Sequence, residues 1–540
     1  MASTLPAGAT AAPVPAAPNV LPRLRATARV LAHPAMLGGL GALPWVVVTV
    51  VGPLLGTDLA AQFARGAFAR AHPGAAYDFS WYGGLHPAAY SVLSPYLFAA
   101  IGVLATGALA TIGASAAMAD MFRIWDARRV RTAAVWTGLG TGASFFAGRV
   151  TFMLGLALAA AAVRLVITPQ RQSNRRLAAA AVLAALCTLA SPVATLFLGL
   201  TAVALLAVGP HRREGLVLGV AAALPMLGVQ LVFPQWGVQP VTIDIAISPM
   251  IGALLVAWLV GWRHRALVVG CLIYSVGCLT AWLLPTPVGN NVERLGLILA
   301  APVIAGLASR LRYALPVLLL LLTWQVYQPA GDIAPGPEPA AHASFSVPLL
   351  TALQIHGAQR YRIEVVSLSE HWEADHIARH YLLARGWERQ LDTVRNPLFY
   401  DGPLNATTYH RWLRYNGVGF VALSDRPVDW GATGEAALVR SGLPYLHEVW
   451  SSDHWTLWRV VDPLPLAGPH AQVTNTSPAG LSLRVERPGN VLVRVRWSPW
   501  LHTSKGCLQQ DGDWTLLHAP VTGSYRIDAP LTLPRGSACA

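Results

Sequence analysis

Long apolar runs recur between Met36 and Tyr327 and set the strongest limit on how this chain can fold. Their lengths suit a hydrocarbon core, which is about 30 Å thick. Only 12% of the 540 residues are charged, against roughly 25% in soluble domains. The sequence therefore predicts a polytopic α-helical membrane protein.

The basic residues lie in short segments between the apolar runs. Because they do not form one basic face, the net charge of +13 does not indicate a nucleic-acid partner. Such segments anchor the cytoplasmic ends of spans and contact anionic membrane lipids. Arg23, Arg25 and Arg29 precede the first span, which places the N-terminus in the cytoplasm and the loop beginning near Asp58 outside.

Two apolar stretches between basic loops are too long for a single crossing at 1.5 Å per residue. We therefore predict short hairpins that turn near Gly148 and Arg149 and at Ser191 and Pro192. The total is about eleven spans in the plasma membrane, which puts the C-terminal third outside. Three glycines inside one span favour close helix packing: Gly138, Gly140 and Gly142.

Composition divides the chain further. Residues 1–35 are rich in Ala and Pro and are predicted to be disordered in the cytoplasm. Residues 36–327 form the transmembrane domain, with an outer loop over 56–93. Residues 328–343, rich in Pro, Ala and Gly, are predicted to be a linker.

The polar tail is predicted to hold two extracytoplasmic domains. Residues 344–463 have mixed α/β patterning, with strands in YRIEVVSL and GVGFVAL and a helix over Asp375 to Arg385. Within residues 464–540, apolar residues occupy every second position on both sides of a Pro488-Gly489-Asn490 turn. This alternation predicts a β-hairpin with one buried face, within a small β-sandwich.

The five cysteines separate by environment. Cys187, Cys271 and Cys278 fall inside apolar spans, where a thiol behaves as a small hydrophobic group. Cys507 and Cys539 lie in the tail, and an extracytoplasmic location allows a disulfide between them.

Asp58 is the first candidate for chemistry because it follows the first span directly. A carboxylate there avoids the roughly 2.5 to 3.5 kcal/mol that the bilayer centre would cost it. It is either a functional acid or the N-cap of the amphipathic segment AAQFARGAFARA. The local sequence leaves both interpretations open.

The rest of the first outer loop gathers aromatic and polar side chains. Trp and Tyr at a membrane boundary commonly form an aromatic belt. Rings beside a Gly-Gly pair, a carboxylate and a histidine instead suit a cleft that stacks a sugar and bonds its hydroxyls. The residues in question are Asp78, Trp81, Tyr82, His86 and Tyr90.

A second outer loop ends in Glu293 and Arg294. These two residues either neutralise each other at the interface, or Arg294 offers its planar fork to a phosphate while Glu293 orients it. Arg149, at a hairpin tip, is a second candidate phosphate ligand or a snorkelling arginine.

Taken together, these features resemble the GT-C superfamily of integral membrane glycosyltransferases. The shared features are an Asp just past the first span, a long first outer loop with aromatic and His content, short hairpin spans and an extracytoplasmic C-terminal domain. The likeness is to actinobacterial cell-envelope arabinosyl- and mannosyltransferases and covers the membrane half and the start of the tail. It implies sugar transfer from a polyprenyl-phosphate donor to an envelope glycan or lipid acceptor on the outer face.

The resemblance also implies roles for individual residues. Asp58 would act as general base on the acceptor hydroxyl. Arg294, with Arg149 and His86, would stabilise the departing polyprenyl phosphate. The tail would hold the acceptor glycan.

Asp78 and Glu293 would bind sugar hydroxyls or a divalent cation (Mg, Mn or Ca). The chain has no Asp-Asp or Glu-Asp pair at the first-loop position. Two other functions remain open: a transporter or flippase of envelope precursors, and a non-catalytic envelope glycan-binding protein. Acidic residues at outer span ends, the lack of a transporter-sized repeat and the large external tail favour an enzyme.

Overall fold

The computed structural model describes residues 30–168, 173–333 and 338–539. Most of the segment predicted to be disordered, and with it Arg23, Arg25 and Arg29, lies outside these residues. The first described helix of the bundle begins at Pro34.

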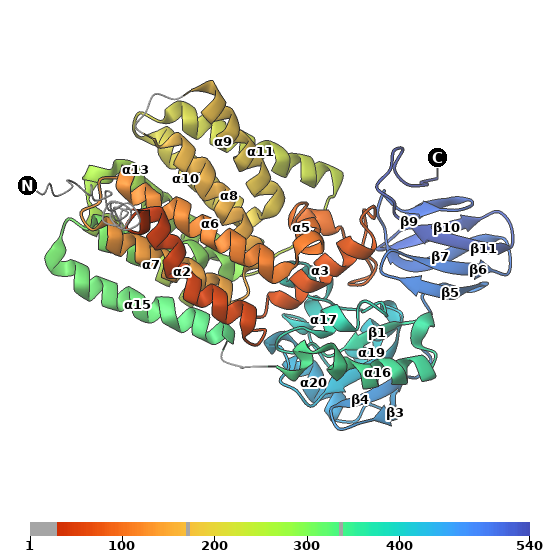
Figure 1. Ribbon diagram of the computed structural model, residues 1–540. Coiled ribbons are helices and arrows are strands. Elements are labelled where there is room, and N and C mark those ends of the chain that lie inside the picture. The colour runs from red at the N-terminus through yellow and green to blue at the C-terminus, as the bar shows by residue number, and fades with distance from the viewer. Residues whose placement is uncertain (1–29, 169–172, 334–337, 540) are drawn as a thin grey trace, which may run out of the picture.

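Helices from the N-terminal two thirds of the chain form a bundle beside the tail (Figure 1). In chain order the bundle helices are α2 (Pro34–Val51), α6 (Val103–Ile124), α7 (Val130–Phe146), α8 (Val150–Val166), α9 (Asn174–Ala190), α10 (Pro192–Ala207), α11 (Arg212–Val232), α12 (Ile243–Val260), α13 (Arg265–Leu283), α14 (Arg294–Leu307) and α15 (Leu311–Ile333). The 3-10 turns η1 (Trp262–His264) and η2 (Gly289–Glu293) precede α13 and α14.

Five helical segments of the described residues are long and apolar enough to cross a membrane. They are Pro34–Val51, Val103–Ile124, Arg212–Val232, Ile243–Val260 and Trp262–Leu283. Shorter apolar helices, among them α8 and α10, lie between them. By these lengths and compositions the chain is a membrane protein, while the count of about eleven spans and their orientation stay predictions.

The two hairpin turns fall where the sequence predicts them. α7 ends at Phe146 and α8 begins at Val150. α9 ends at Ala190, and the Ser191 hydroxyl caps α10 by accepting the N–H of Ala194 at 3.4 Å. Such a cap satisfies a backbone donor that the first turn of a helix leaves free.

Glycines allow α7 to approach α2 closely, as predicted from the sequence. A Cβ atom added to Gly138 would collide with the backbone of Gly38 and Ala42. One added to Gly142 would lie 2.6 Å from the ring of Trp45. Small residues of this kind let helix backbones pack together in membranes.

Basic turns meet at one end of the bundle. Asp120, in the last turns of α6, pairs with Arg123 at 3.0 Å and with Arg164 of α8 at 2.5 Å. Arg263, after α12, pairs with Asp126 at 3.2 Å. The basic segments therefore share one end, as the positive-inside rule requires.

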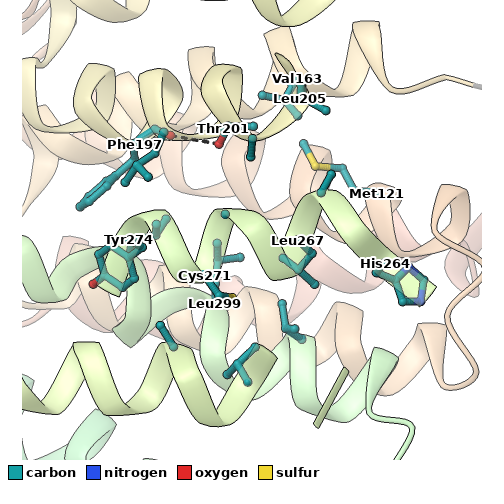
Figure 2. Close-up of a pocket in the computed structure, with 18 of the residues that line it drawn as sticks. Met121, Val163, Phe197, Thr201, Leu205, His264, Leu267, Cys271, Tyr274 and Leu299 are labelled. Atoms are coloured by element: carbon teal, nitrogen blue, oxygen red, sulfur yellow. Dashed lines mark hydrogen bonds between the residues drawn. The ribbon is translucent and has the colours of Figure 1, made fainter. Parts of the chain in front are cut away.

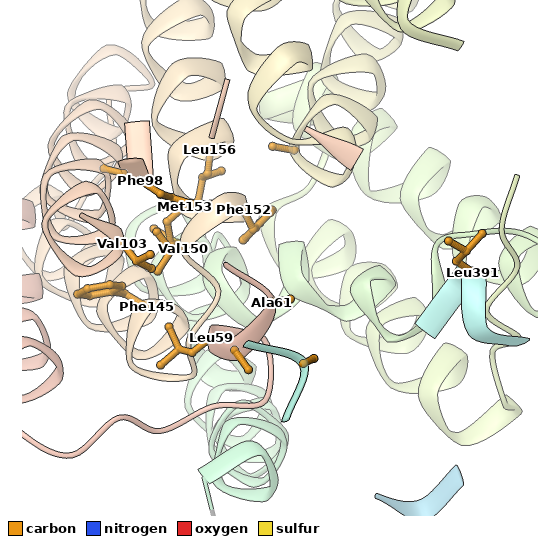
Figure 3. Packing of buried hydrophobic residues seen from close by; sticks show 14 of the residues in the cluster. Leu59, Ala61, Phe98, Val103, Phe145, Val150, Phe152, Met153, Leu156 and Leu391 are labelled. Carbon is orange, nitrogen blue, oxygen red and sulfur yellow. The ribbon is translucent and has the colours of Figure 1, made fainter. Parts of the chain in front are cut away.

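The segment after α2 folds into short helices at the opposite end, between the bundle and the tail (Figure 1). These are α3 (Leu59–Ala71), α4 (Pro87–Tyr90) and α5 (Ser94–Ile101). Figure 3 shows Leu59 and Ala61 of α3 close to Phe145, Val150 and Phe152 of the α7–α8 hairpin. This packing fixes the start of α3 against the ends of the spans.

A four-stranded sheet and surrounding helices form the first part of the tail. Its strands are ordered β1-β2-β4-β3, and β1 and β2 are parallel. The elements are η3 (Pro339–Ala341), α16 (Ala343–Ile355), η4 (Ala358–Arg360), β1 (Arg362–Val365), α17 (Glu373–His376), α18 (Arg389–Arg395), η5 (Pro397–Phe399), α19 (Ala406–Tyr415), β2 (Val418–Ser424), η6 (Trp430–Ala432), α20 (Thr433–Arg440), β3 (Leu446–Ser451) and β4 (Trp455–Val460).

The helix predicted over Asp375 to Arg385 is wrong. Only the turn α17 forms, because the following residues pair with a strand instead. Ile363 of β1 donates to the oxygen of Leu382 at 2.9 Å, and Ala384 donates to the oxygen of Ile363 at 2.9 Å. The first residues of the predicted linker, 328–343, belong to α15, which continues to Ile333.

Two sheets form the last part of the tail, ordered β5-β6-β11-β8 and β7-β10-β9. The strands are β5 (Ala471–Ser477), β6 (Gly480–Val485), β7 (Gly489–Arg496), β8 (His502–Thr503), β9 (Cys507–Asp511), β10 (Trp514–Ala519) and β11 (Gly523–Asp528). Cys507 and Cys539, the pair for which the sequence allows a disulfide, are joined by one.

The predicted hairpin between β6 and β7 is wrong, although the alternation is correct. β6 pairs with β5 and β11, whereas β7 pairs with β10 in the other sheet. The short connection crosses the sandwich, so Leu483 and Val485 face Val491 and Val493 across one buried core. In a β-sandwich the side chains on the inner faces of the two sheets pack together to form one core.

Candidate functional site

Asp58 and Arg294 meet at the tail-facing end of the bundle. The Nη2 atom of Arg294 lies 2.8 Å from Oδ2 of Asp58, and their side chains are 13% and 34% exposed. Asp58 is the N-cap residue of α3, but its side chain makes no capping bond. The capping interpretation is therefore wrong, because the carboxylate turns to the first residue of α14 instead.

The α7–α8 turn holds the backbone of Asp58 in place. The side-chain amide of Gln62 in α3 donates to the backbone oxygen of Asp58 at 2.9 Å and to that of Gly148 at 2.6 Å. Its own side-chain oxygen accepts the N–H of Thr151 at 3.0 Å. Arg149 is in this turn, immediately before α8. The α7–α8 turn and the start of α14 therefore converge beside Asp58.

A second ion pair lies about two turns further along α3. Arg65 Nη2 is 2.7 Å from Oε2 of Glu388, and both side chains are less than 10% exposed. Gln235, after α11, donates to the other carboxylate oxygen of Glu388 at 3.0 Å. Neither Arg65 nor Glu388 was predicted as a site residue.

The ring of Tyr90 lies against the Arg65–Glu388 pair. The guanidinium carbon of Arg65 is 3.9 Å from the centre of the Tyr90 ring. Burial raises the pKa of the Tyr90 phenol; Asp58 and Glu388 raise it further, while Arg65 and Arg294 oppose this. Both ion pairs therefore lie near enough to act on the same phenol.

The tail contributes a tryptophan to the same region. The indole N–H of Trp387 donates to the backbone oxygen of Thr57 at 2.7 Å. Its ring stacks on His371 with centroids 3.5 Å apart, and Arg389, paired with Asp429 at 2.6 Å, lies 4.9 Å above it. Trp387 thus fixes the residue that precedes Asp58.

Trp81 and Tyr82, which are predicted to bind a sugar, join the segment after α3 to the tail. Trp81 is buried and donates its indole N–H to the oxygen of Ala374 at 3.0 Å. The Tyr82 hydroxyl accepts the backbone N–H of Glu388 at 3.0 Å. Tyr82 also has a positive φ of 57°, a strained backbone that its surroundings must enforce.

Asp78 is not brought to Asp58. Its carboxylate accepts the N–H of Ser80 at 2.8 Å, and its backbone pairs with Leu85. Burial raises its carboxyl pKa to about 6. It lines a separate cavity, on the far side of α3.

Glu293 points away from the Asp58–Arg294 pair as well. It is 4% exposed, and one of its carboxylate oxygens accepts the indole N–H of Trp324 of α15 at 3.3 Å. Glu293 and Asp78, predicted to hold a divalent cation, therefore have partners on different elements. Among the described residues no group of three or more His, Cys, Asp or Glu side chains could hold a metal ion, and the cation stays a prediction.

His86 joins the loop to the β-sandwich. Its Nδ1 lies 3.0 Å from the oxygen of Ala76 and its Nε2 lies 3.2 Å from the Ser498 hydroxyl. Burial lowers its pKa to about 4, and the bond to Ala76 opposes this only in part. The imidazole is therefore neutral at pH 7.

This environment predicts a loss of stability in acid. Because the unfolded chain binds the proton more readily between pH 6.5 and 4, the unfolding free energy should fall by roughly 3 kcal/mol across that window. We expect the thermal midpoint of the wild type to drop more steeply there than that of His86→Gln. Parallel pH curves for the two proteins would contradict this assignment.

An apolar cavity of about 490 Å³ runs between the bundle helices from the basic end towards Arg294. Figure 2 shows Phe197, Leu205 and Val163 on one side of it and Tyr274 and Leu267 on the other. Its lining reaches Leu295 and Gly296, immediately after Arg294, and at the other end includes His211, Arg263 and Arg265.

By sequence, the β-sandwich matches a known family. By structure, most of the chain matches solved proteins. A family model described as a domain of unknown function (DUF8823) matches residues 468–506 and 501–540. No curated protein sequence matches the chain. The structural matches are to arabinofuranosyltransferase AftD from mycobacteria.

The AftD structure is 15% identical, covers 85% of this chain and 41% of its own length, and has a TM-score of 0.41. Two classes of an AftD point mutant are 14% and 12% identical and cover 84% and 93% of this chain, with TM-scores of 0.40 and 0.42. This chain spans 42% and 60% of their lengths.

Proposed function

We propose that this chain is a membrane glycosyltransferase of the GT-C type that uses a polyprenyl-phosphate-linked sugar. The observation that carries the proposal is the 2.8 Å pair between Asp58 and Arg294. A carboxylate and a guanidinium from distant turns meet there beside an apolar cavity. Transfer from a lipid-linked donor needs all three: a cationic group for the phosphate, a carboxylate to take the proton of the acceptor, and an apolar cavity for the lipid chain.

Arg294 is suited to the donor phosphate. A guanidinium has five N–H donors, so it can bond a carboxylate and a phosphate at the same time. Its carbon lies 5.5 Å from the centre of the Phe152 ring, which restricts its orientation. The cavity that begins at Leu295 would take the first part of the polyprenyl chain, while Arg149 is a second candidate for the phosphate.

Asp58 is suited to the acceptor. In the proposed step the acceptor oxygen attacks the anomeric carbon and its proton passes to the Asp58 carboxylate. The bond between the anomeric carbon and the phosphate oxygen breaks, and its electron pair leaves on the phosphate. Arg294 stabilises this charge. A single displacement of this kind inverts the anomeric configuration.

The donor sugar proposed is of the arabinose or mannose class, and the acceptor is an envelope glycan or lipid on the outer face. Both follow from the sequence resemblance. The tail docks beside α3, since Glu388 and Trp387 contact Arg65 and Thr57. It therefore stands next to any acceptor that reaches Asp58.

Sugar transfer by the purified full chain tests the proposal. The chain, reconstituted in vesicles, is given polyprenyl-phosphate arabinofuranose or mannose together with a matching oligosaccharide acceptor. We expect an acceptor product heavier by one pentose or one hexose in mass spectrometry. No product with either donor, from protein that stays folded and monodisperse, would leave a transporter or a glycan-binding protein instead.

Trp387 is expected to act as a positioning residue. Trp387→Phe removes the N–H that bonds Thr57, so Asp58 loses a constraint while the Asp58 side chain is unchanged. We expect kcat to fall roughly tenfold with little change in KM, and stability to fall by about 1 kcal/mol. Trp430→Phe is the control, because Trp430 is 67% exposed in the same domain. Equal kinetics for both variants would remove this role.

A further inference from the structure

A second cavity, of about 510 Å³, lies on the far side of α3 from the Asp58–Arg294 pair. Residues four and seven apart share one face of a helix. Asp58, Gln62 and Arg65 form the face that carries the site, whereas the residues 63, 67 and 70 lie on the opposite face and line the second cavity. The helix α3 therefore forms a wall between the two.

The walls of the second cavity come from three parts of the chain. α3 and the start of α6 supply the membrane side, α17 supplies the α/β domain, and Pro478 supplies the β-sandwich. Trp81 belongs to its lining and also lies 5.9 Å from the guanidinium carbon of Arg65. The cavity thus exists only where bundle and tail are docked together.

Polar groups in this cavity balance each other in charge. Arg379 donates to both oxygens of Asp375 at 2.7 Å, and Asp78 and Arg70 add one charge of each sign to the lining. Asp78 is 7% exposed, and Ser80 lies beside it. A formally neutral set of donors and acceptors favours a neutral, polyhydroxylated ligand over an anion or a cation.

Aromatic and apolar walls complete the match to a carbohydrate. Phe63, Phe68, Phe98 and Trp81 line the cavity, and aromatic rings are suited to contact the apolar face of a sugar ring. Concave sites with mostly apolar walls and a few convergent polar groups are the usual form of small-ligand sites.

We propose that this second cavity binds a neutral glycan, through a sugar unit that is not the one reacting at Asp58. An α-helix with its side chains is about 10–12 Å across, so one sugar unit cannot occupy both sides of α3. The inference rests on the proposed function for its biological meaning, but binding itself can be measured without transfer.

The test measures binding of a neutral arabino-oligosaccharide of several units to the full chain in nanodiscs, by calorimetry. Ala67→Trp fills the cavity from the face of α3 and should weaken binding about tenfold or more. Ala100→Trp, on an exposed position of α5, is the matched control and should bind as the wild type does. Asp78→Asn, which keeps the shape of the side chain, should weaken binding too and serves if Ala67→Trp does not fold.

The outcomes separate this inference from the proposed function. Binding that is lost in Ala67→Trp and kept in Asp58→Asn supports the inference, even if no transfer is seen. Binding by the wild type that neither Ala67→Trp nor Asp78→Asn weakens overturns the inference while leaving the transferase proposal intact. No binding of the oligosaccharide to the wild type also overturns it.

Discussion

Replacing Asp58 by Asn should reduce sugar transfer by about 10² to 10⁴-fold, the usual contribution of a general base. The amide has the shape of the carboxylate, and its oxygen can still accept the N–H of Arg294. In the wild type the Nη2 atom of Arg294 lies 2.8 Å from Oδ2 of Asp58. It cannot take the proton of the acceptor hydroxyl. The measurement is the initial rate of transfer in vesicles at saturating donor.

The fold should tolerate this change. The Asp58 side chain is 34% exposed and makes no capping bond, and ion pairs that are this open to solvent contribute at most about 1 kcal/mol. Asp126→Asn is the matched control, because Asp126 pairs with Arg263 at the other end of the bundle and is 89% exposed. A rate for Asp58→Asn within twofold of that control would show that Asp58 is not the base.

Arg294→Gln should have an effect of similar size, about 10² to 10³-fold, because it removes the group that stabilises the departing phosphate. Arg294→Lys should retain more activity than Gln, since it keeps the charge but loses the planar fork. Both kcat and the KM for the donor should be measured. The KM for the donor should rise as well, because Arg294 would bind the phosphate in the intact donor and not only during its departure.

A surface arginine provides the control for this series. Arg123→Gln removes an arginine that is 54% exposed at the opposite end of the bundle and should leave transfer unchanged. If Arg294→Gln and Arg123→Gln gave the same kinetics, the donor phosphate would have to be bound elsewhere.

The sequence identified Asp58 and Arg294 as separate candidates, and the structure brings their side chains together. Asp58 and Arg294 each adjoin an apolar run, so both had to lie at an end of the bundle. Their separation in sequence, 236 residues, did not matter. Arg65 could have been predicted too, since it shares a helix face with Asp58 at a spacing of seven.

The contribution of the tail could not be predicted. Glu388 lies 323 residues from its partner Arg65, in a segment with no regular pattern. The same limit explains the strand error, because alternation in β6 and β7 reveals which side of each strand is buried but not which strand it pairs with. His86 shows the converse case, where a residue type suited to chemistry serves a junction between domains.

Locating a bound polyprenyl phosphate in the full chain by electron cryo-microscopy tests most directly whether Arg294 holds the donor. We expect the phosphate at hydrogen-bond distance, about 3 Å, from the Arg294 guanidinium, with the isoprenoid chain entering the cavity beside Tyr274. A phosphate bound only at the basic end of the bundle, with Arg294 still closed on Asp58, would contradict it.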